Sequence, residues 1–341
     1  MKIAELKNHL ANHSEEQLRL AITEIYKAIP KAIKESKDID SIIVNPDKFI
    51  EGKKKSIKRS QIPDIELLKI DVDTFIEFAM NQFYYVPNQF VSKKERPKWR
   101  FAVKRFYKEL FLSSQNETDL VPATELLEKL YNLMCYSCRY VIFSSYDSFE
   151  SIGIEQKDFF SRVLFLKYQF EPKRTFIRNA LNLMNNNSLN RYTLYSTLIE
   201  VILSFLKSTD MLEMAIEENS KLLQIEKEKQ IFKSNDNYSK YDKEQKINNL
   251  AEFGFFCYVK LFEMDKAVEF FKQNCVESSD EIALYVLLNL LFSLNQKDIF
   301  LREYENAIKD GVKPRGELAK MYKFTKESGK LPKYFGWFEK S

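Results

Sequence analysis

The sequence predicts an all-α protein, and three features of the chain lead to that prediction. Apolar side chains recur about every 3.6 positions along almost the whole 341-residue chain, which is the spacing of one face of an α-helix. No segment has the pattern of a β-strand. The seven glycines never fall into the G-x-G-x-x-G or G-x-x-x-x-G-K spacing, so the motifs of nucleotide-binding α/β folds are absent from the sequence.

The first helices can be placed from their starting signals. A short helix over about residues 3–11 is followed by Ser14-Glu15-Glu16-Gln17. These residues have the form of a capping box, in which the serine and glutamine side chains satisfy amides at the helix start. The next helix begins there and keeps one apolar face until Pro30 bends or stops it. Residues 36–63 lose the helical period and are expected to form a loop or a mobile connection.

The same periodicity predicts a long series of further helices. They are expected at about residues 71–85, 95–112, 120–143, 155–169, 173–186, 189–207, 209–232, 240–262, 264–275, 279–294, 297–310 and 314–328. Alternating charges interrupt the pattern within residues 224–246, which form the clearest linker. We expect an N-terminal helical domain over residues 1–190 and a solenoid-like array of antiparallel helical hairpins over residues 191–341.

The composition indicates a well-packed cytoplasmic protein. Its 28 Phe and 18 Tyr are expected mainly in the core, because bulky rings fill the space between packed helices. Residues 1–16 hold no apolar run long enough for an export signal, and the most apolar stretch, 282–294, is shorter than the roughly 20 residues that cross a bilayer. Four cysteines do not make a disulfide framework, which favours a reducing cytosol and no membrane partner.

The C-terminal segment resembles a known repeat family. Helix corners at Glu263-Met264-Asp265-Lys266-Ala267 and Asn295-Gln296-Lys297-Asp298-Ile299 lie 32 residues apart. Around the first corner the motif residues are Leu250, Phe253, Gly254, Tyr258 and Phe270-Phe271, and residues 307–314 (A-I-K-D-G-V-K-P) have the form of a related turn. On these residues, segment 245–330 resembles a degenerate tetratricopeptide repeat array, although an ordinary antiparallel helix pair has the same pattern.

A second resemblance covers residues 1–170. Its motifs are Ser14-Glu15-Glu16-Gln17-Leu18, Ile25-Tyr26-Lys27 with Pro30, the stretch 98–108, Tyr146-Asp147 and Phe159-Phe160-Ser161-Arg162-Val163-Leu164. These residues resemble an uncharacterised bacterial family described as a domain of unknown function. The resemblance implies helices and no known activity, so it supplies no functional residues.

The two histidines do not indicate a metal site. His9 and His13 are four residues apart, which is a spacing used by helical metal sites, but no third ligand completes the set. Asp71 and Asp73 are expected to open a helix, where the helix dipole favours carboxylates without a metal.

The cysteines are expected to be structural. Cys135 and Cys138 form a C-x-x-C unit, and Cys138 shares an apolar stripe with Met134, which places it in the core in the middle of a helix. Zinc would require Cys257 and Cys275 to converge on that pair. We therefore assign no catalytic residue, no metal ligand and no cofactor.

The best functional candidate is the basic segment 93–108, which holds eight cations and one acid. Wound as a helix, it buries Trp99, Val103, Phe106 and Leu110 on one stripe and spreads Lys98, Arg100, Lys104, Arg105 and Lys108 over the opposite arc. A second basic run upstream contains Lys53, Lys54, Lys55, Lys58 and Arg59. Such cations can neutralise phosphates, and a merely solvated cationic face has the same residues.

Two further segments concentrate polar and aromatic side chains. The loop 144–153 has the composition of a binding loop and also that of a turn and helix cap. At the C-terminus, Tyr334, Phe335, Trp337 and Phe338 crowd into five residues. They are expected either to seal the last repeat of their own chain or to anchor a partner.

These observations favour a non-catalytic scaffolding protein that captures a protein or peptide partner on a helical-repeat surface, because helix arrays expose extended concave surfaces. The alternative is a nucleic-acid-binding protein that uses the two basic segments. The sequence does not indicate an oligomeric state.

Overall fold

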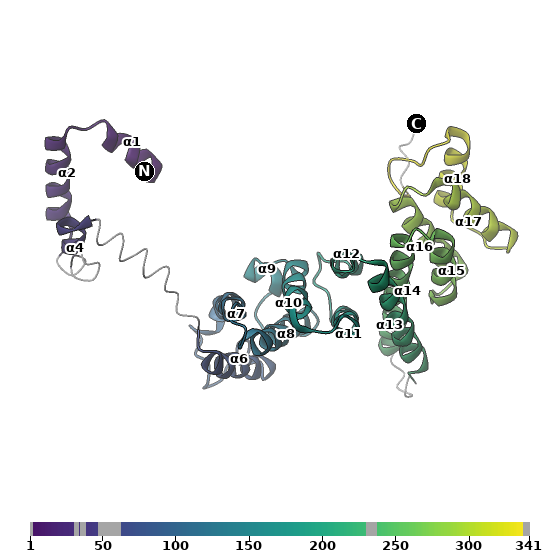
Figure 1. Ribbon diagram of the computed structural model, residues 1–341, viewed down its shortest axis with the longest axis horizontal. Coiled ribbons are helices and arrows are strands. Elements are labelled where there is room, and N and C mark those ends of the chain that lie inside the picture. Colours follow the sequence, from purple (N-terminus) through teal and green to yellow (C-terminus); the bar gives the residue numbers. More distant parts are fainter. Residues whose placement is uncertain (1–2, 31–33, 35–38, 47–62, 230–236, 337–341) are drawn as a thin grey trace. The chain divides into compact units, whose positions relative to one another are not determined.

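A computed structural model describes residues 3–30, 34, 39–46, 63–229 and 237–336. The chain divides into two units, Met1–Ile62 and Pro63–Ser341. In the described ranges helices are joined by turns and bends without any strand, which confirms the all-α prediction (Figure 1). None of the helices in these ranges combines the length and the apolar content needed to span a bilayer.

The described part of the N-terminal unit contains α1 (Ile3–Ala11), α2 (Glu15–Ala28) and α4 (Ile39–Val44). The Ser14 hydroxyl accepts a hydrogen bond from the Gln17 amide at 3.3 Å, and the Gln17 side chain accepts one from the Ser14 amide at 2.9 Å. The predicted capping box is therefore confirmed. Helix α4 lies in the stretch that was expected to be a loop, so that expectation is wrong for residues 39–44.

The larger unit consists of helices in close succession. Its described helices are α6 (Ile65–Met80), the 3₁₀ helix η1 (Arg96–Lys98), α7 (Trp99–Ser113), α8 (Leu120–Tyr136), α9 (Ser148–Ile152), α10 (Gln156–Phe170), α11 (Lys173–Asn185), α12 (Tyr195–Phe205), α13 (Thr209–Glu228), α14 (Asn237–Lys260), α15 (Met264–Asn274), α16 (Asp280–Ser293), α17 (Lys297–Lys309) and α18 (Gly316–Ser328). Apart from the short η1 and α9, each matches a predicted helix. Most ends agree within a few residues.

Three predicted helix ends are wrong by more than that. The Asp64 carboxylate accepts hydrogen bonds from the amides of Glu66 and Leu67, so α6 begins at Ile65 and Asp71 lies inside it. Helix α8 stops at residue 136, which puts Cys138 in the following turn rather than in the middle of a helix. Helix α12 begins at residue 195, after a loop that was expected to be helical.

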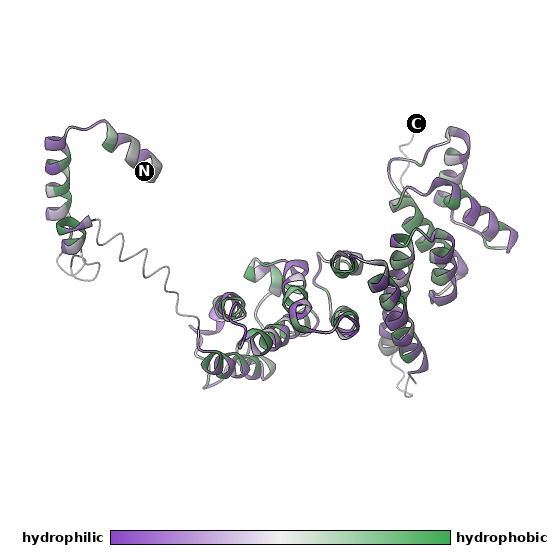
Figure 2. Cartoon of the chain, in the orientation of Figure 1, coloured by the Kyte–Doolittle hydropathy of each residue, from purple (hydrophilic) through white to green (hydrophobic). Residues whose placement is uncertain are grey.

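The amphipathic pattern explains which faces are buried. In α7 the stripe of Trp99, Val103, Phe106 and Leu110 is buried as predicted, and the Trp99 ring stacks on Phe143 with centroids 4.1 Å apart. In Figure 2 most helices contain both hydrophobic and hydrophilic residues. Burying such apolar stripes is the main source of stability for helices in water.

Helix α14 contributes to two hydrophobic clusters. The first collects buried side chains from α6 to α14, including Leu250 and Phe253. The second collects them from α14 to α18, including Ala251 and Phe255. Phe256 is partly buried and packs against both clusters. The predicted domain division near residue 190 is not tested, and helices on both sides of that position supply the first cluster.

Neighbouring helices pack largely in chain order, and at Gly254 of α14 the ring of Phe270 of α15 lies close to the backbone. A Cβ atom added there would lie 2.1 Å from Cε1 of Phe270. Since real Cβ atoms do not approach so closely, a glycine at this position allows the two helices to pack.

Candidate functional site

A groove of about 290 Å³ lies between helices α15, α16 and α17. Phe271, Leu284 and Leu287 are buried side chains that line it, and Ala307 and Val312 add further apolar surface. An apolar side chain of a partner could enter because the walls are already formed. This groove is a concave surface on the C-terminal helices that has apolar side chains in its lining.

The charged side chains around the groove are mainly acidic. Asp280, Glu303 and Asp310 contribute carboxylates, and Lys272 contributes a cation. Glu303 is 5% exposed and pairs with Lys272 at 3.2 Å and with Arg302 at 3.1 Å. Asp280 and Asp310 are exposed and form no ion pair with a described residue. Two carboxylates at the groove therefore have no cationic side chain paired with them among the described residues.

The C-terminal ends of two helices add negative potential to the groove, while Asp280 lies at the positive N-terminal end of α16. Cys275 is the C-cap of α15 and Asp310 is the C-cap of α17, and both residues line the groove. The carbonyl end of a helix carries a partial negative charge. A cation bound beside Asp310 would therefore be attracted both by the carboxylate and by the helix end.

The structure places the cations of α7 at exposed positions. These residues are Lys98, Arg100, Lys104, Arg105 and Lys108. Lys98 pairs with Glu95 at 2.7 Å, and Arg105 pairs with Asp71 at 3.0 Å. The other three form no ion pair with a described residue. Three cations are thus available on this face of the helix.

An exposed aromatic ring lies among these cations. Phe101 is 61% exposed, and the Arg100 guanidinium lies 5.7 Å from its ring centre. The second basic run, which holds Lys53, Lys54, Lys55, Lys58 and Arg59, lies outside the described residues. A joint basic surface made by the two segments stays a prediction.

The aromatic tail is described only as far as residue 336. The ring of Phe335 packs edge-on against Tyr285 and Phe292 of α16, with centroids 5.1 and 5.4 Å apart. Tyr334 is exposed, and Trp337 and Phe338 lie outside the described residues. Phe335 therefore docks on its own chain, and anchoring of a partner by the tail stays a prediction.

Burial makes all four thiols weakly acidic. It raises the pKa of Cys138 and of Cys275 to about 12, and it also raises the pKa of the more deeply buried Cys135 and Cys257. Protonated thiols are poor nucleophiles and poor metal ligands. Across the described ranges, no three His, Cys, Asp or Glu side chains come together as a metal site would require.

The histidines lie together at the end of α1. Nδ1 of His13 is 2.7 Å from the carbonyl oxygen of His9, one helical turn earlier. This contact ties the ring to a backbone group at the end of the helix. The contact uses the His13 ring and only the backbone of His9.

Most polar groups of the loop 144–153 serve the local backbone. The Asp147 carboxylate accepts a hydrogen bond from the Glu150 amide at 3.0 Å and so caps α9, and Ser145 donates to the Asp147 carbonyl at 2.8 Å. Tyr146 is different, because it is 84% exposed and has the Arg191 guanidinium 4.4 Å from its ring centre.

Arg191 belongs to a loop that the helical pattern of the sequence did not predict. This loop, residues 186–194, connects α11 to α12 and is held by Gln156, a fully buried side chain. Gln156 donates to the Ser188 carbonyl at 3.0 Å and accepts from the Asn190 amide at 2.8 Å. The polar run N-N-N-S-L-N-R-Y over residues 185–192 is the signal that could have revealed it.

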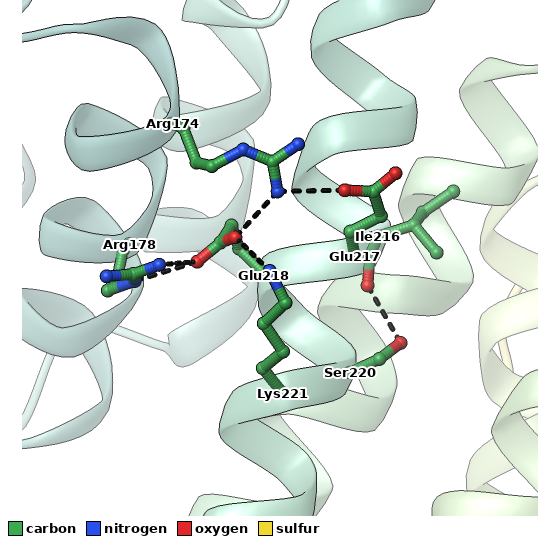
Figure 3. A network of polar contacts seen from close by, with 7 residues as sticks. All are labelled: Arg174, Arg178, Ile216, Glu217, Glu218, Ser220 and Lys221. Atoms are coloured by element: carbon green, nitrogen blue, oxygen red, sulfur yellow. Dashed lines mark hydrogen bonds and ion pairs between the residues drawn. The ribbon is translucent and has the colours of Figure 1, made fainter.

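A buried carboxylate that the sequence did not reveal joins α11 to α13 (Figure 3). The Glu218 side chain is 1% exposed and receives Arg174 at 2.8 Å, Arg178 at 2.6 Å and Lys221 at 2.7 Å. Burial alone would raise the pKa of Glu218, but hydrogen bonds from Lys221, Arg174 and Arg178 outweigh it and lower the pKa to about 2. The carboxylate therefore stays ionised and holds the two helices together.

These sites have to be interpreted from their own geometry. Comparison of the chain with models of protein families, with curated proteins and with solved structures gave no match. The two family resemblances therefore stay predictions.

Proposed function

We propose that this chain is a cytoplasmic scaffolding protein that captures a peptide segment of a partner in the groove between α15, α16 and α17. The observation that carries the proposal is the pairing of an apolar lining with two carboxylates, Asp280 and Asp310, that form no ion pair with a described residue. Such a surface suits a segment in which an apolar residue is flanked by Lys or Arg. The four free thiols fit a reducing compartment.

A solenoid-like array of hairpins is the second part of the proposal. Helices α14 to α18 share one hydrophobic cluster, and consecutive helices among them are in contact. Gly254 and Phe270, which belong to the motif of the tetratricopeptide resemblance, lie so close that a Cβ added at Gly254 would meet the Phe270 ring. The Tyr258 and Phe270 rings also meet, with centroids 5.5 Å apart. Stacked hairpins of this kind commonly form binding surfaces for peptides.

Peptide titration tests the proposal directly. The probe is a fluorescent helical peptide of about 16 residues with leucine on one face and lysine beside it, compared with a peptide in which glutamate replaces lysine. We expect only the lysine peptide to bind the full chain. In the variant with Asp280→Asn and Asp310→Asn, its affinity should fall roughly five- to tenfold, since each rim charge contributes up to about 1 kcal/mol.

A matched control removes the same charge elsewhere. Glu200 and Glu213 are exposed residues outside the groove and form no ion pair with a described residue, so the variant with Glu200→Gln and Glu213→Gln should keep its affinity within about twofold. Equal binding of both peptides, or full affinity after loss of the two groove carboxylates, would contradict the proposal.

A second candidate function is nucleic-acid binding by the exposed face of α7. The observation that favours it is that Arg100, Lys104 and Lys108 lack ion pairs with described residues and lie near the exposed Phe101 ring. Binding of duplex DNA or heparin should weaken steeply with salt and should be lost when all three cations are changed to glutamate. The same triple reversal at Lys207, Lys313 and Lys320 is the control, and equal loss in both variants would exclude a specific role for α7.

A further inference from the structure

A second cavity, of about 480 Å³, lies in the Pro63–Ser341 unit where three segments meet. The turn after α8 forms one wall, the 186–194 loop forms another, and the first half of α14 forms the third. Its lining combines side-chain amides, charged groups, tyrosines and leucines. This cavity and the groove between α15, α16 and α17 share no lining residue.

Side-chain amides without partners line this cavity. Asn185 is 6% exposed, and its Oδ1 accepts a hydrogen bond from Nδ2 of Asn249 at 3.2 Å. Nδ2 of Asn185 has no hydrogen-bond partner among the described residues, and neither end of the half-buried Gln245 amide has one. These amide groups face the cavity, where they can donate hydrogen bonds to a ligand and accept them from it.

The wall formed by the 186–194 loop is fixed in position. Buried Gln156 bonds to the backbone at Ser188 and Asn190 from behind. The Tyr195 hydroxyl donates to the Asn187 carbonyl at 3.3 Å from the other end of the loop. A ligand would therefore meet a preformed surface, which lowers the entropic cost of binding.

Flat and apolar side chains complete the walls. Tyr195 is half buried, Tyr241 is exposed, and Leu189 and Leu194 lie beside them in the lining. Aromatic rings of this kind stack on planar heterocycles. The cavity thus combines ring faces with side-chain amides.

The charged groups of the cavity favour an anion. Nζ of Lys246 lies 2.9 Å from Oδ1 of Asn186, a neutral amide, and forms no ion pair with a described residue. Arg139 adds a second cation and is paired with Asp242 at 3.0 Å. With two cations and one carboxylate, the lining has an excess positive charge. A neutral sugar could use the amides and the rings but would not need Lys246.

We propose that this cavity binds a nucleotide. The amides of Asn185 and Gln245 offer donors and acceptors that match the edge of a nucleobase, and the tyrosine rings stack on its face. Lys246 meets the phosphate, and the Asp242 carboxylate accepts hydrogen bonds from the ribose hydroxyls. The site needs no glycine-rich loop, because an ammonium group rather than backbone amides binds the phosphate.

Calorimetry on the full chain tests the proposal with AMP, GMP, CMP and UMP, followed by the matching nucleoside and by ribose 5-phosphate. We expect at least one nucleotide to bind with micromolar affinity. Asn185→Asp keeps the shape and the acceptor but removes the donors, so it should weaken nucleotide and nucleoside binding about tenfold. Lys246→Met should weaken nucleotide binding about tenfold and leave the nucleoside unaffected.

Two controls make the result specific. Lys260→Met removes an exposed charge from the same helix outside the cavity and should leave binding unchanged. Thermal melting confirms that each variant is folded. The proposal is wrong if no nucleotide binds at millimolar concentration, if ribose 5-phosphate binds as tightly as the nucleotide, or if Lys246→Met weakens nucleoside and nucleotide equally. A pentanucleotide that binds more tightly than the mononucleotide would identify a single strand as the source of the ligand.

Discussion

The larger unit contains two helix–helix contacts, or joints, that are stabilised by different interactions. Helices α11 and α13 meet around the buried carboxylate of Glu218 and its three cations. Helices α14 and α15 meet where Gly254 leaves room for the Phe270 ring. The first joint depends on charge and the second on volume.

The stability of the two joints should respond differently to substitution and to pH. Arg174, Arg178 and Lys221 have side chains that are 44%, 51% and 58% exposed, so water can solvate them if Glu218 is lost. At the α14–α15 joint water cannot relieve a steric clash, so the helices or the Phe270 ring have to shift. We therefore expect the apolar joint to be more sensitive to substitution and the charged joint to be more sensitive to pH.

The largest effect is expected from Gly254→Val, which should break the apolar joint. Even the first added carbon would lie 2.1 Å from the Phe270 ring, so helix and ring must shift. We expect the free energy of unfolding to fall by about 3 kcal/mol in a urea titration.

The Phe270→Ala background shows whether the ring is the cause. With the ring removed, Gly254→Val should cost less than about 1 kcal/mol, because valine is a better helix former than glycine. An equal cost in both backgrounds would mean that the close contact with Phe270 does not limit this position.

The charged joint should lose less when Glu218 becomes glutamine. The shape is kept, but the three cations lose their shared carboxylate, and we expect a loss of about 2 kcal/mol in the free energy of unfolding. Glu217→Gln, one residue away, is the control. Glu217 is 58% exposed and pairs with Arg174 at 2.8 Å, so its loss should cost less than about 0.5 kcal/mol. Similar losses in the two variants would contradict the special role of the buried carboxylate.

Lowering the pH should reduce the stability contribution of the charged joint and leave that of the apolar joint unchanged. The pKa of Glu218 is lowered from 4.5 to about 2, so its contribution to stability is complete above pH 4.5 and is lost as the pH falls toward 2. The stability difference between the natural chain and Glu218→Gln should therefore shrink by about 1–2 kcal/mol over that interval. The difference between the natural chain and Gly254→Val should stay constant, and a parallel decrease in both would argue against Glu218 as the titrating group.

The smallest effect is expected from an exposed ion pair that also joins two helices. Lys129 of α8 pairs with Asp73 of α6 at 2.9 Å, and both side chains are largely solvated. A double-mutant cycle with alanine at both positions should give a coupling below about 0.5 kcal/mol. A coupling as large as the Glu218 effect would show that burial is not what distinguishes the charged joint.

Local patterns in the sequence were enough to predict most of the helices. Ser14 and Gln17 cap α2 through neighbours in the chain, and the stripe from Trp99 to Leu110 is buried because its spacing follows one helical face. A helix start was predicted wrongly where the N-capping residue was not recognised. Asp64, for example, starts α6 six residues before the predicted position.

The candidate sites were less predictable because their residues meet only after folding. Glu218 lies 44 and 40 residues from Arg174 and Arg178, and no periodicity links a buried acid to distant partners. The exposed cations of α7 could be predicted, since they depend on one helix alone. The groove and the amide-lined cavity each combine three separate segments, which a linear pattern cannot bring together.

Helix α14 packs into both hydrophobic clusters, which has a consequence for the synthesis and the truncation of this protein. Ala251 and Phe255 find their neighbours in helices that the ribosome produces later, whereas Leu250 and Phe253 face helices that already exist. A fragment that stops after α14 would expose a row of large apolar groups and should aggregate. A nascent chain faces the same hazard until α18 has emerged, so the four helices α15 to α18 act as an obligatory cover for this face of α14.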